Sequence, residues 1–169
     1  DAMALEALSL ISKWLPVVYD DPQNLNARSG MLVGSCLAGV SFLKGLGLVH
    51  AISHMVGAEY NTQHGLTNSI ILPTVLRFNL PGMEEKVARM SQSMNLTDNS
   101  ISGFIDNIET LLNRLQIPKS LGEIGVPLDC SRRIAEKALI DSAAATNPKK
   151  ANASELENLV KQSILGVHK

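Results

Sequence analysis

The stretch ISGFIDNIETLLNRL, residues 101–115, carries the clearest structural signal in this chain of 169 residues. Its apolar residues recur every three or four positions, apart from two adjacent pairs: Ile101, Phe104, Ile105, Ile108, Leu111, Leu112 and Leu115. That period places all seven side chains on one face of an α-helix. The stretch therefore predicts a helix that faces the core, ended by Pro118.

The same helical period extends to both sides of this stretch, and no segment alternates long enough to be a strand. Helices are expected at the N-terminus up to Pro16, then over residues 24–43, 47–56, 65–76, from Pro81 or Gly82 through Met94, over 134–145, and from a capping box at Ser154 and Glu157. The last of these should bury Leu156, Val160 and Ile164. We predict an all-α bundle of about eight helices in a single domain, residues 1–169.

Charge and cysteine content exclude several classes of protein. Lys and Arg number 15 against 16 Asp and Glu, a net charge of -1, and no block of five like charges occurs. Nucleic-acid binding is therefore disfavoured. Cys36 and Cys130 lie too far apart for a zinc motif or a disulfide framework, so both are expected to be small buried residues of a reduced, cytoplasmic protein.

The best candidate for a membrane span is the uncharged stretch of residues 29–43. Its 15 residues fall short of the roughly 20 needed to cross a bilayer. Gly30, Gly34 and Gly39 within it suit close helix packing in a core. We therefore expect no membrane partner, and because the chain begins at Asp1 within an expected helix, we expect it to be a piece of something longer.

Three of the four histidines fall within 15 residues. His50 and His54 are four apart, so a helix places them on one face, and a turn before His64 could bring its ring to the same face. Neutral imidazoles bind Fe and Zn, but the spacing alone is more typical of structural histidines with satisfied hydrogen bonds than of metal ligands. Residues 45–75 contain one acid and no Lys or Arg, which favours a shared cleft for the three rings. His168 is assigned no role.

The segment around these histidines resembles the iron-containing alcohol dehydrogenases. GLVHAISHMVGA (47–58), QHGLTN (63–68), LP (72–73) and RFN (77–79) follow the family pattern GLxHAxxHxxGxxxxxxHGxxNxxxLPxVxxFN over 33 residues without a gap. Later, IPKSL (117–121) and TNPK (146–149) are similar to further family segments. The resemblance implies that nearly the whole chain is the C-terminal helical domain of such an enzyme.

The resemblance also implies roles for individual residues. His50 and His64 match two of the family's metal ligands. His54 matches a histidine of the catalytic cleft beside the nicotinamide, which either relays a proton or only makes a positioning hydrogen bond. Asp1 matches a ligand aspartate, but Leu5 stands where the family has a further ligand histidine. Either that ligand has been lost, or two residues of the molecule are missing from the printed sequence.

The implied reaction is hydride transfer from a small alcohol, the reverse reaction reducing an aldehyde. Fe²⁺, with Zn²⁺ as a chemical alternative, would bind the alcohol oxygen and lower its pKa. NAD(P) would be bound mainly by a preceding α/β domain that is absent from this chain, so the chain alone should be inactive. Two other readings stay open: a non-catalytic helical module with a degenerate metal site, and an interaction domain that forms homo-oligomers through residues 29–43.

Overall fold

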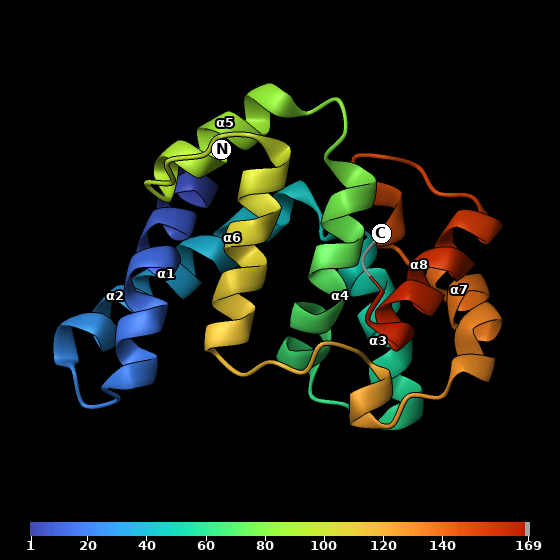
Figure 1. Cartoon of the computed structure of the whole chain (residues 1–169). Coiled ribbons are helices and arrows are strands. Elements are labelled where there is room, and N and C mark those ends of the chain that lie inside the picture. Colours follow the sequence, from blue (N-terminus) through green and yellow to red (C-terminus); the bar gives the residue numbers. More distant parts are fainter. Residues whose placement is uncertain (168–169) are drawn as a thin grey trace. The chain divides into compact units, whose positions relative to one another are not determined.

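Eight α-helices and four single 3-10 turns form the chain in the computed structural model, which describes residues 1–167 (Figure 1). The helices are α1 (Ala2–Asp20), α2 (Leu25–Ser41), α3 (Gly47–Tyr60), α4 (His64–Asn79), α5 (Glu84–Ser93), α6 (Ile101–Arg114), α7 (Ser131–Leu139) and α8 (Ala153–Leu165). The turns are η1 (Phe42–Lys44), η2 (Gly122–Ile124), η3 (Leu128–Cys130) and η4 (Ala144–Thr146). None of the described residues forms a strand, so the all-α prediction is confirmed. His168 lies outside the described residues.

The helices divide into two compact units. Unit 1 comprises Asp1–Lys44 and Leu80–Leu115, and unit 2 comprises Gly45–Asn79 and the chain from Gln116 on. Each unit is described by itself below. The expectation of a single domain stays a prediction.

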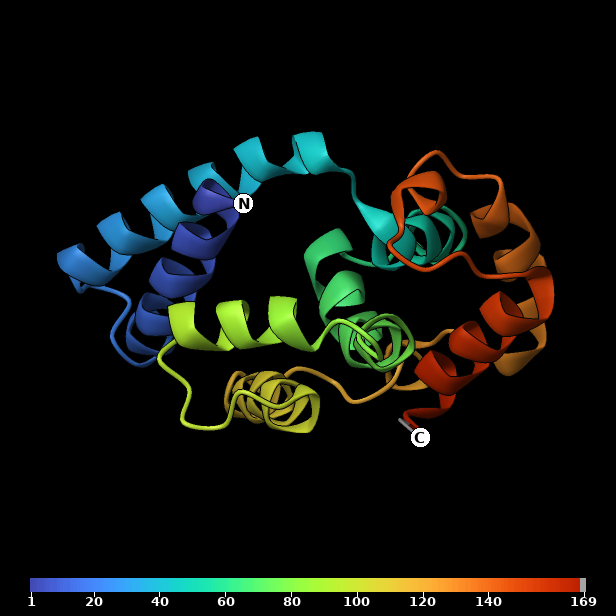
Figure 2. The same ribbon diagram turned by 90° about the horizontal axis from the view of Figure 1, so that it is seen from above.

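In unit 1, α1 and α2 lie side by side and approach closely at two glycines (Figure 2). A Cβ atom at Gly30 would overlap the indole ring of Trp14, and one at Gly34 would lie 3.0 Å from Cγ1 of Ile11. Both glycines therefore serve the close packing that the sequence predicts. At Gly39 a Cβ would meet no atom within 4 Å, so the same prediction is wrong there.

One face of α2 is open, contrary to the expected burial of residues 29–43 in a core. Leu32 is 74% exposed and Leu43 93% exposed, and the thiol-bearing Cys36 is exposed as well. Cys130 is buried, as predicted. The stretch is not fully buried because α1 packs against the face of α2 that carries Gly30 and Gly34 and leaves the opposite face open.

α1 continues past the proline that was expected to end it. Pro16 lies inside the helix, which runs on to Asp20. A proline forfeits one backbone hydrogen bond, and the half-buried Val17 and Val18 extend the packed face beyond it. By length and composition α1 alone could cross a membrane, as could α2 and α3 taken together, and core helices of globular proteins pass the same test.

Other helix boundaries differ from the sequence prediction by a few residues. α6 ends at Arg114, ahead of Pro118. Gln116, two residues after the helix end, turns the chain with a φ of 56°. α5 begins at Glu84, after Gly82 rather than at it. The capping box of α8 is formed by Asn152 and Glu155, two residues before the predicted pair, because Asn caps a helix as well as Ser does.

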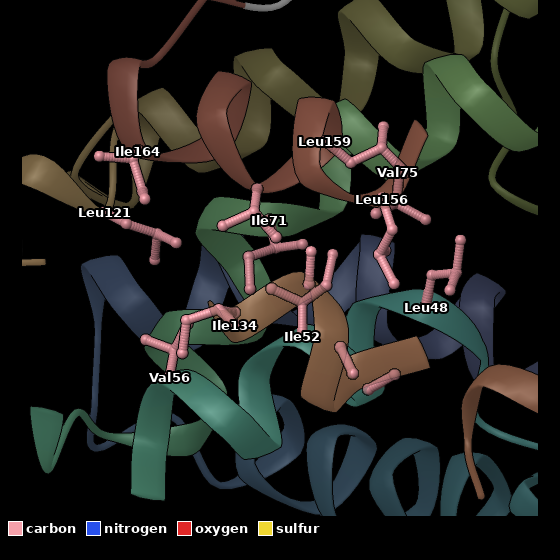
Figure 3. Close-up of a cluster of buried hydrophobic side chains, with 14 of the residues drawn as sticks. Leu48, Ile52, Val56, Ile71, Val75, Leu121, Ile134, Leu156, Leu159 and Ile164 are labelled. Carbon is pink, nitrogen blue, oxygen red and sulfur yellow. The ribbon is translucent and has the colours of Figure 1, made fainter. Parts of the chain in front are cut away.

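The core of unit 2 is built by α3, α4, α7 and α8 (Figure 3). The figure shows apolar side chains of these helices, together with Leu121 from the chain just before η2, pointing toward one another: Leu48, Ile52, Val56, Ile71, Val75, Leu121, Ile134, Leu156, Leu159 and Ile164. The predicted face of α8 is confirmed, because Leu156, Val160 and Ile164 are all buried. Leu48, Ile52 and Val56 form one buried ridge of α3. The histidines that follow the first two by two positions are therefore turned about 200° round the helix, away from this ridge.

Candidate functional site

Three imidazoles lie together in unit 2. The ring centroids of His50 and His64 are 5.2 Å apart, those of His54 and His64 5.7 Å, and those of His50 and His54 5.8 Å. His50 and His54 come from consecutive turns of α3, and His64 is the first residue of α4. The structure therefore brings the three histidines to one place, as their spacing predicts.

A three-residue turn places His64 against α3. Asn61 ends α3 in the left-handed conformation, with φ 52° and ψ 38°, and its N–H donates to the carbonyl of Gly57 at 3.0 Å. Gln63 then caps the first turn of α4, because its side-chain Oε1 accepts the N–H of Leu66 at 2.5 Å. The chain reverses within these residues, and the first side chain of α4 faces the histidines of α3.

Asn68 joins two of the three rings. Its amide nitrogen lies 3.0 Å from Nε2 of His64 and 3.5 Å from Nε2 of His50. An amide N–H donates, so each Nε2 accepts with its lone pair when the ring is neutral. The two Nε2 lone pairs thus face one partially positive group. Within residues 1–167, the Oδ1 atom of Asn68 is buried and has no hydrogen-bond partner.

The surroundings of His50 favour its neutral form. Burial lowers the pKa of His50 below its usual value, and the neighbouring His64 and His54 lower it further. The backbone near Leu46 and the carboxylate of Asp141 act in the opposite direction but more weakly. Neutral imidazole is the form that binds a metal ion, so this environment favours the ligand state of His50.

His54 has a different partner. Its Nδ1 lies 3.2 Å from Oδ2 of Asp141, whose side chain is only 14% exposed, whereas that of His54 is 37% exposed. The other oxygen of Asp141 accepts the N–H of Ala143 at 2.8 Å. This turn follows α7, which ends at Leu139, so the prediction of one helix over residues 134–145 is wrong beyond that residue. Sequence reasoning missed Asp141, whose local signal is an aspartate turn of a common kind.

The TNPK segment holds the start of α3 from 99 or 100 residues away in the chain. Thr146 Oγ1 accepts the N–H groups of Leu46 and Gly47 at 3.1 and 3.3 Å, and Asn147 Oδ1 accepts that of Leu48 at 3.0 Å. α3 has no side-chain cap of its own, so these bonds satisfy donors that a helix start otherwise leaves open. The segment thereby fixes the helix that carries two of the histidines.

The far end of α3 is tied to α7 by charge. Both Nε and Nη2 of Arg133 donate to Oε2 of Glu59, at 3.0 and 2.8 Å, and Lys137 lies 2.7 Å from Oε1. These hydrogen bonds lower the pKa of Glu59 below its usual value. α3 is thus held at both ends by side chains from the C-terminal part of unit 2.

Asp1 and Leu5 belong to unit 1. The Asp1 carboxylate forms an ion pair with Lys44 and lies 3.8 Å from Nη1 of Arg89. Leu5 and Met90 line a pocket of unit 1 to which Asp1, Lys44 and Arg89 also contribute. No group of three or more His, Cys, Asp or Glu side chains within residues 1–167 is arranged to hold a metal ion.

The donor chemistry of unit 2 nevertheless fits the metal implied by the resemblance. His50 and His64 each place Nε2 beside the amide nitrogen of Asn68, and imidazole suits Fe²⁺ and Zn²⁺ alike. Two imidazoles and a carboxylate leave coordination positions open for a substrate oxygen. His50 and His64 of unit 2 thus offer two nitrogen donors of the kind that such a set requires.

Comparison with known proteins identifies the family. The sequence model of the family described as "Fe-containing alcohol dehydrogenase family, C-terminal" matches residues 1–164. The chain is 32% identical to the NAD-dependent methanol dehydrogenase of Bacillus methanolicus, over 97% of this chain and 45% of that protein. It is 35% identical to the 1,3-propanediol dehydrogenase of Citrobacter freundii, over 96% of this chain and 44% of that protein.

Solved structures agree. A 1,3-propanediol oxidoreductase superimposes with a TM-score of 0.93 at 34% identity, over 97% of this chain and 45% of that one. The chain thus spans a little under half the length of the relatives that it matches. It belongs to the Fe-containing alcohol dehydrogenase family and corresponds to the C-terminal helical part of that family's members.

Proposed function

We propose that this chain is the metal-binding helical domain of an NAD(P)-dependent, iron-type alcohol dehydrogenase. In the complete enzyme, a divalent metal would assist hydride transfer between a small alcohol and the nicotinamide. The observation that carries the proposal is the convergence of the Nε2 atoms of His50 and His64 on one amide nitrogen, that of Asn68. Family membership supports the reaction class.

His50 and His64 are the ligands that the geometry supports. Asp1 is the third ligand suggested by the family resemblance, and it stays a prediction. Because its carboxylate pairs with Lys44, metal binding by Asp1 requires that ion pair to open. Leu5 supplies no ligand atom, so this chain offers one ligand fewer than the family pattern.

A bound divalent ion supplies a Lewis acid that lowers the pKa of an alcohol. The chain's own share of the chemistry is proton transfer. His54 stands beside both proposed ligand rings and is partly exposed, so that it can take the alcohol proton and pass it to water. If His54 only positions the substrate through a hydrogen bond, its replacement should weaken substrate binding more than turnover.

The nicotinamide would be held by an α/β domain outside this chain, so we expect the 169 residues alone not to oxidise alcohols. The substrate class follows from relatives named for methanol and 1,3-propanediol, and a small alcohol or its aldehyde is proposed here. We place the enzyme in the cytoplasm, in agreement with the two unpaired cysteines.

Anaerobic calorimetric titration of the metal-stripped chain with Fe²⁺, repeated with Zn²⁺, tests the proposal. We expect one-to-one binding with a Kd of about 1 µM or tighter. His50→Ala and His64→Ala should abolish this binding, and His54→Ala should leave it intact. An intact-mass measurement on the same sample shows whether two further residues are present near Asp1.

Failure to bind either ion, at a mass that matches the sequence, would overturn the proposal. The chain would then be a helical module of the family with a degenerate site, as Leu5 suggests. Loss of binding in His54→Ala alone would contradict the division of roles among the three histidines.

A second candidate function is self-association through residues 29–43. The exposed Leu32 on α2 and Leu43 in η1 favour it, because apolar patches of this kind commonly mark interaction surfaces. Sedimentation at increasing protein concentration should reveal a dimer that Leu32→Lys disrupts. A monomer at all concentrations would exclude this function.

A further inference from the structure

The carboxylate of Asp141 has two separate tasks. Oδ1 accepts the N–H of Ala143 at 2.8 Å, and Oδ2 lies 3.2 Å from Nδ1 of His54. The backbone carbonyl of Asp141 also accepts the N–H of Ala144 at 3.0 Å. The turn therefore holds the carboxylate in place, so that Oδ2 cannot rotate freely away from the histidine.

The chemistry of this pair determines where the proton of His54 sits. An ionised carboxylate accepts hydrogen bonds and donates none. Nδ1 of a neutral His54 must consequently carry the proton, and Nε2 on the other edge of the ring keeps its lone pair. A general base that removes a proton needs such a lone pair.

We infer that Asp141 is a positioning residue that fixes His54 in the Nδ1–H tautomer and leaves Nε2 as the basic atom. This inference rests on the proposed function for its role in the reaction. In the proton-transfer step, the O–H bond of the alcohol breaks and an Nε2–H bond forms. The resulting imidazolium is stabilised by the carboxylate of Asp141, which itself takes up no proton.

Asp141→Asn should invert the tautomer. The amide oxygen of the new side chain can continue to accept the N–H of Ala143, which turns its NH₂ group toward His54. An NH₂ group donates, so Nδ1 of His54 must become the acceptor and the proton must move to Nε2. The variant keeps the size and the turn of the aspartate, so the fold should be preserved.

The test is ¹⁵N NMR of the histidine-labelled, metal-free chain at about pH 8, above the usual imidazole pKa of about 6.5. For wild-type His54 we expect a pyrrole-type Nδ1 and a pyridine-type Nε2. Asp141→Asn should exchange the two, and Asp141→Ala should give a mixture. Asp129→Asn, an equal change at an exposed aspartate of unit 2, should leave the wild-type pattern.

A pyridine-type Nδ1 in the wild-type chain would overturn the inference without any variant. An unchanged pattern in a folded Asp141→Asn chain would overturn it as well. Since the signal is read without metal or alcohol, a failed metal titration would refute the proposed function and leave the tautomer result standing. In the complete enzyme, Asp141→Asn should lower kcat by about 10²-fold or more with little change in KM.

Discussion

Replacing Asn147 with alanine should destabilise unit 2 at the start of α3. The amide of Asn147 makes four hydrogen bonds: Oδ1 accepts from Leu48 N and from Asn79 Nδ2, both at 3.0 Å, and Nδ2 donates to Asn79 Oδ1 at 2.7 Å and to the Lys149 carbonyl at 2.6 Å. Alanine removes all four.

The magnitude follows from what each partner can do without Asn147. The Lys149 carbonyl is exposed, so water replaces the lost bond at little cost. Asn79 is half-buried and loses two bonds, which costs about 1 kcal/mol, and the N–H of the buried Leu48 is left unsatisfied, which costs about 1–3 kcal/mol. The total is about 2–4 kcal/mol, or a fall in Tm of about 4–15 °C for a chain of this size.

The assay is urea unfolding followed by far-UV circular dichroism, with hydrogen exchange of the Leu48 amide as a local readout. Asn113→Ala, at an exposed position of α6, serves as the control and should change stability by less than about 0.5 kcal/mol. The double variant with Asn79→Ala should cost less than the sum of the single variants, because the two amides bond each other. Equal stability of Asn147→Ala and wild type, with Leu48 still protected, would refute the argument that the TNPK segment caps α3.

Three further predictions concern packing, charge and thiols. Gly30→Ala should destabilise the chain by about 1–3 kcal/mol because the new methyl group overlaps the indole ring of Trp14. Gly39→Ala, which has open space around it, should stabilise the chain by about 0.5–1 kcal/mol, and thermal unfolding of both variants checks the two expectations. Because the pKa of Glu59 is lowered in the folded chain, its carboxylate stabilises the fold above the ordinary carboxyl pKa of 4.5, and this stabilisation is lost as the pH falls through the lower folded pKa. Glu59→Gln should therefore be less stable than wild type at neutral pH, and the two should be equally stable in strong acid. A thiol reagent should modify Cys36 alone in the native chain and Cys130 only after unfolding, and modification of both at equal rates would contradict the described burial.

Local periodicity was sufficient for much of the helical architecture. The 101–115 stretch predicts the start of α6 at Ile101 and its buried face, because its period is long and unbroken, and the helix ends at Arg114, ahead of the predicted stop at Pro118. Asn24 marks the start of α2, where its side chain accepts the N–H of Ala27 at 3.0 Å. Both signals lie within a single helix and its cap, so the sequence displays them directly.

Tertiary context decided the features that the sequence did not predict. The period of residues 29–43 indicates a helix, but it cannot tell which face another helix covers, and Gly39 and Cys36 fall on the open one. Asn152 and Ser154 each stand three residues before a glutamate, and the sequence does not show which pair forms the box; in the structure it is Asn152 and Glu155.

The same distinction applies to the site. The spacing of His50 and His54 predicts their shared face because four residues make about one helical turn. Asp141 lies 87 residues from its partner His54, and Asn147 lies 99 residues from Leu48. No local pattern encodes such pairs, since they depend on how α7 and the TNPK segment return to α3.

X-ray absorption of the chain loaded with Fe²⁺ or Zn²⁺ tests the central claim most directly, because it counts the imidazoles bound to the metal. We predict two imidazole nitrogens, at about 2.0–2.1 Å when the ion is zinc. Two imidazoles should remain bound in His54→Ala, and His64→Ala should hold no metal ion. A shell of oxygen atoms alone in the wild-type chain, or the loss of an imidazole in His54→Ala, would contradict the assignment of His50 and His64 as the metal ligands.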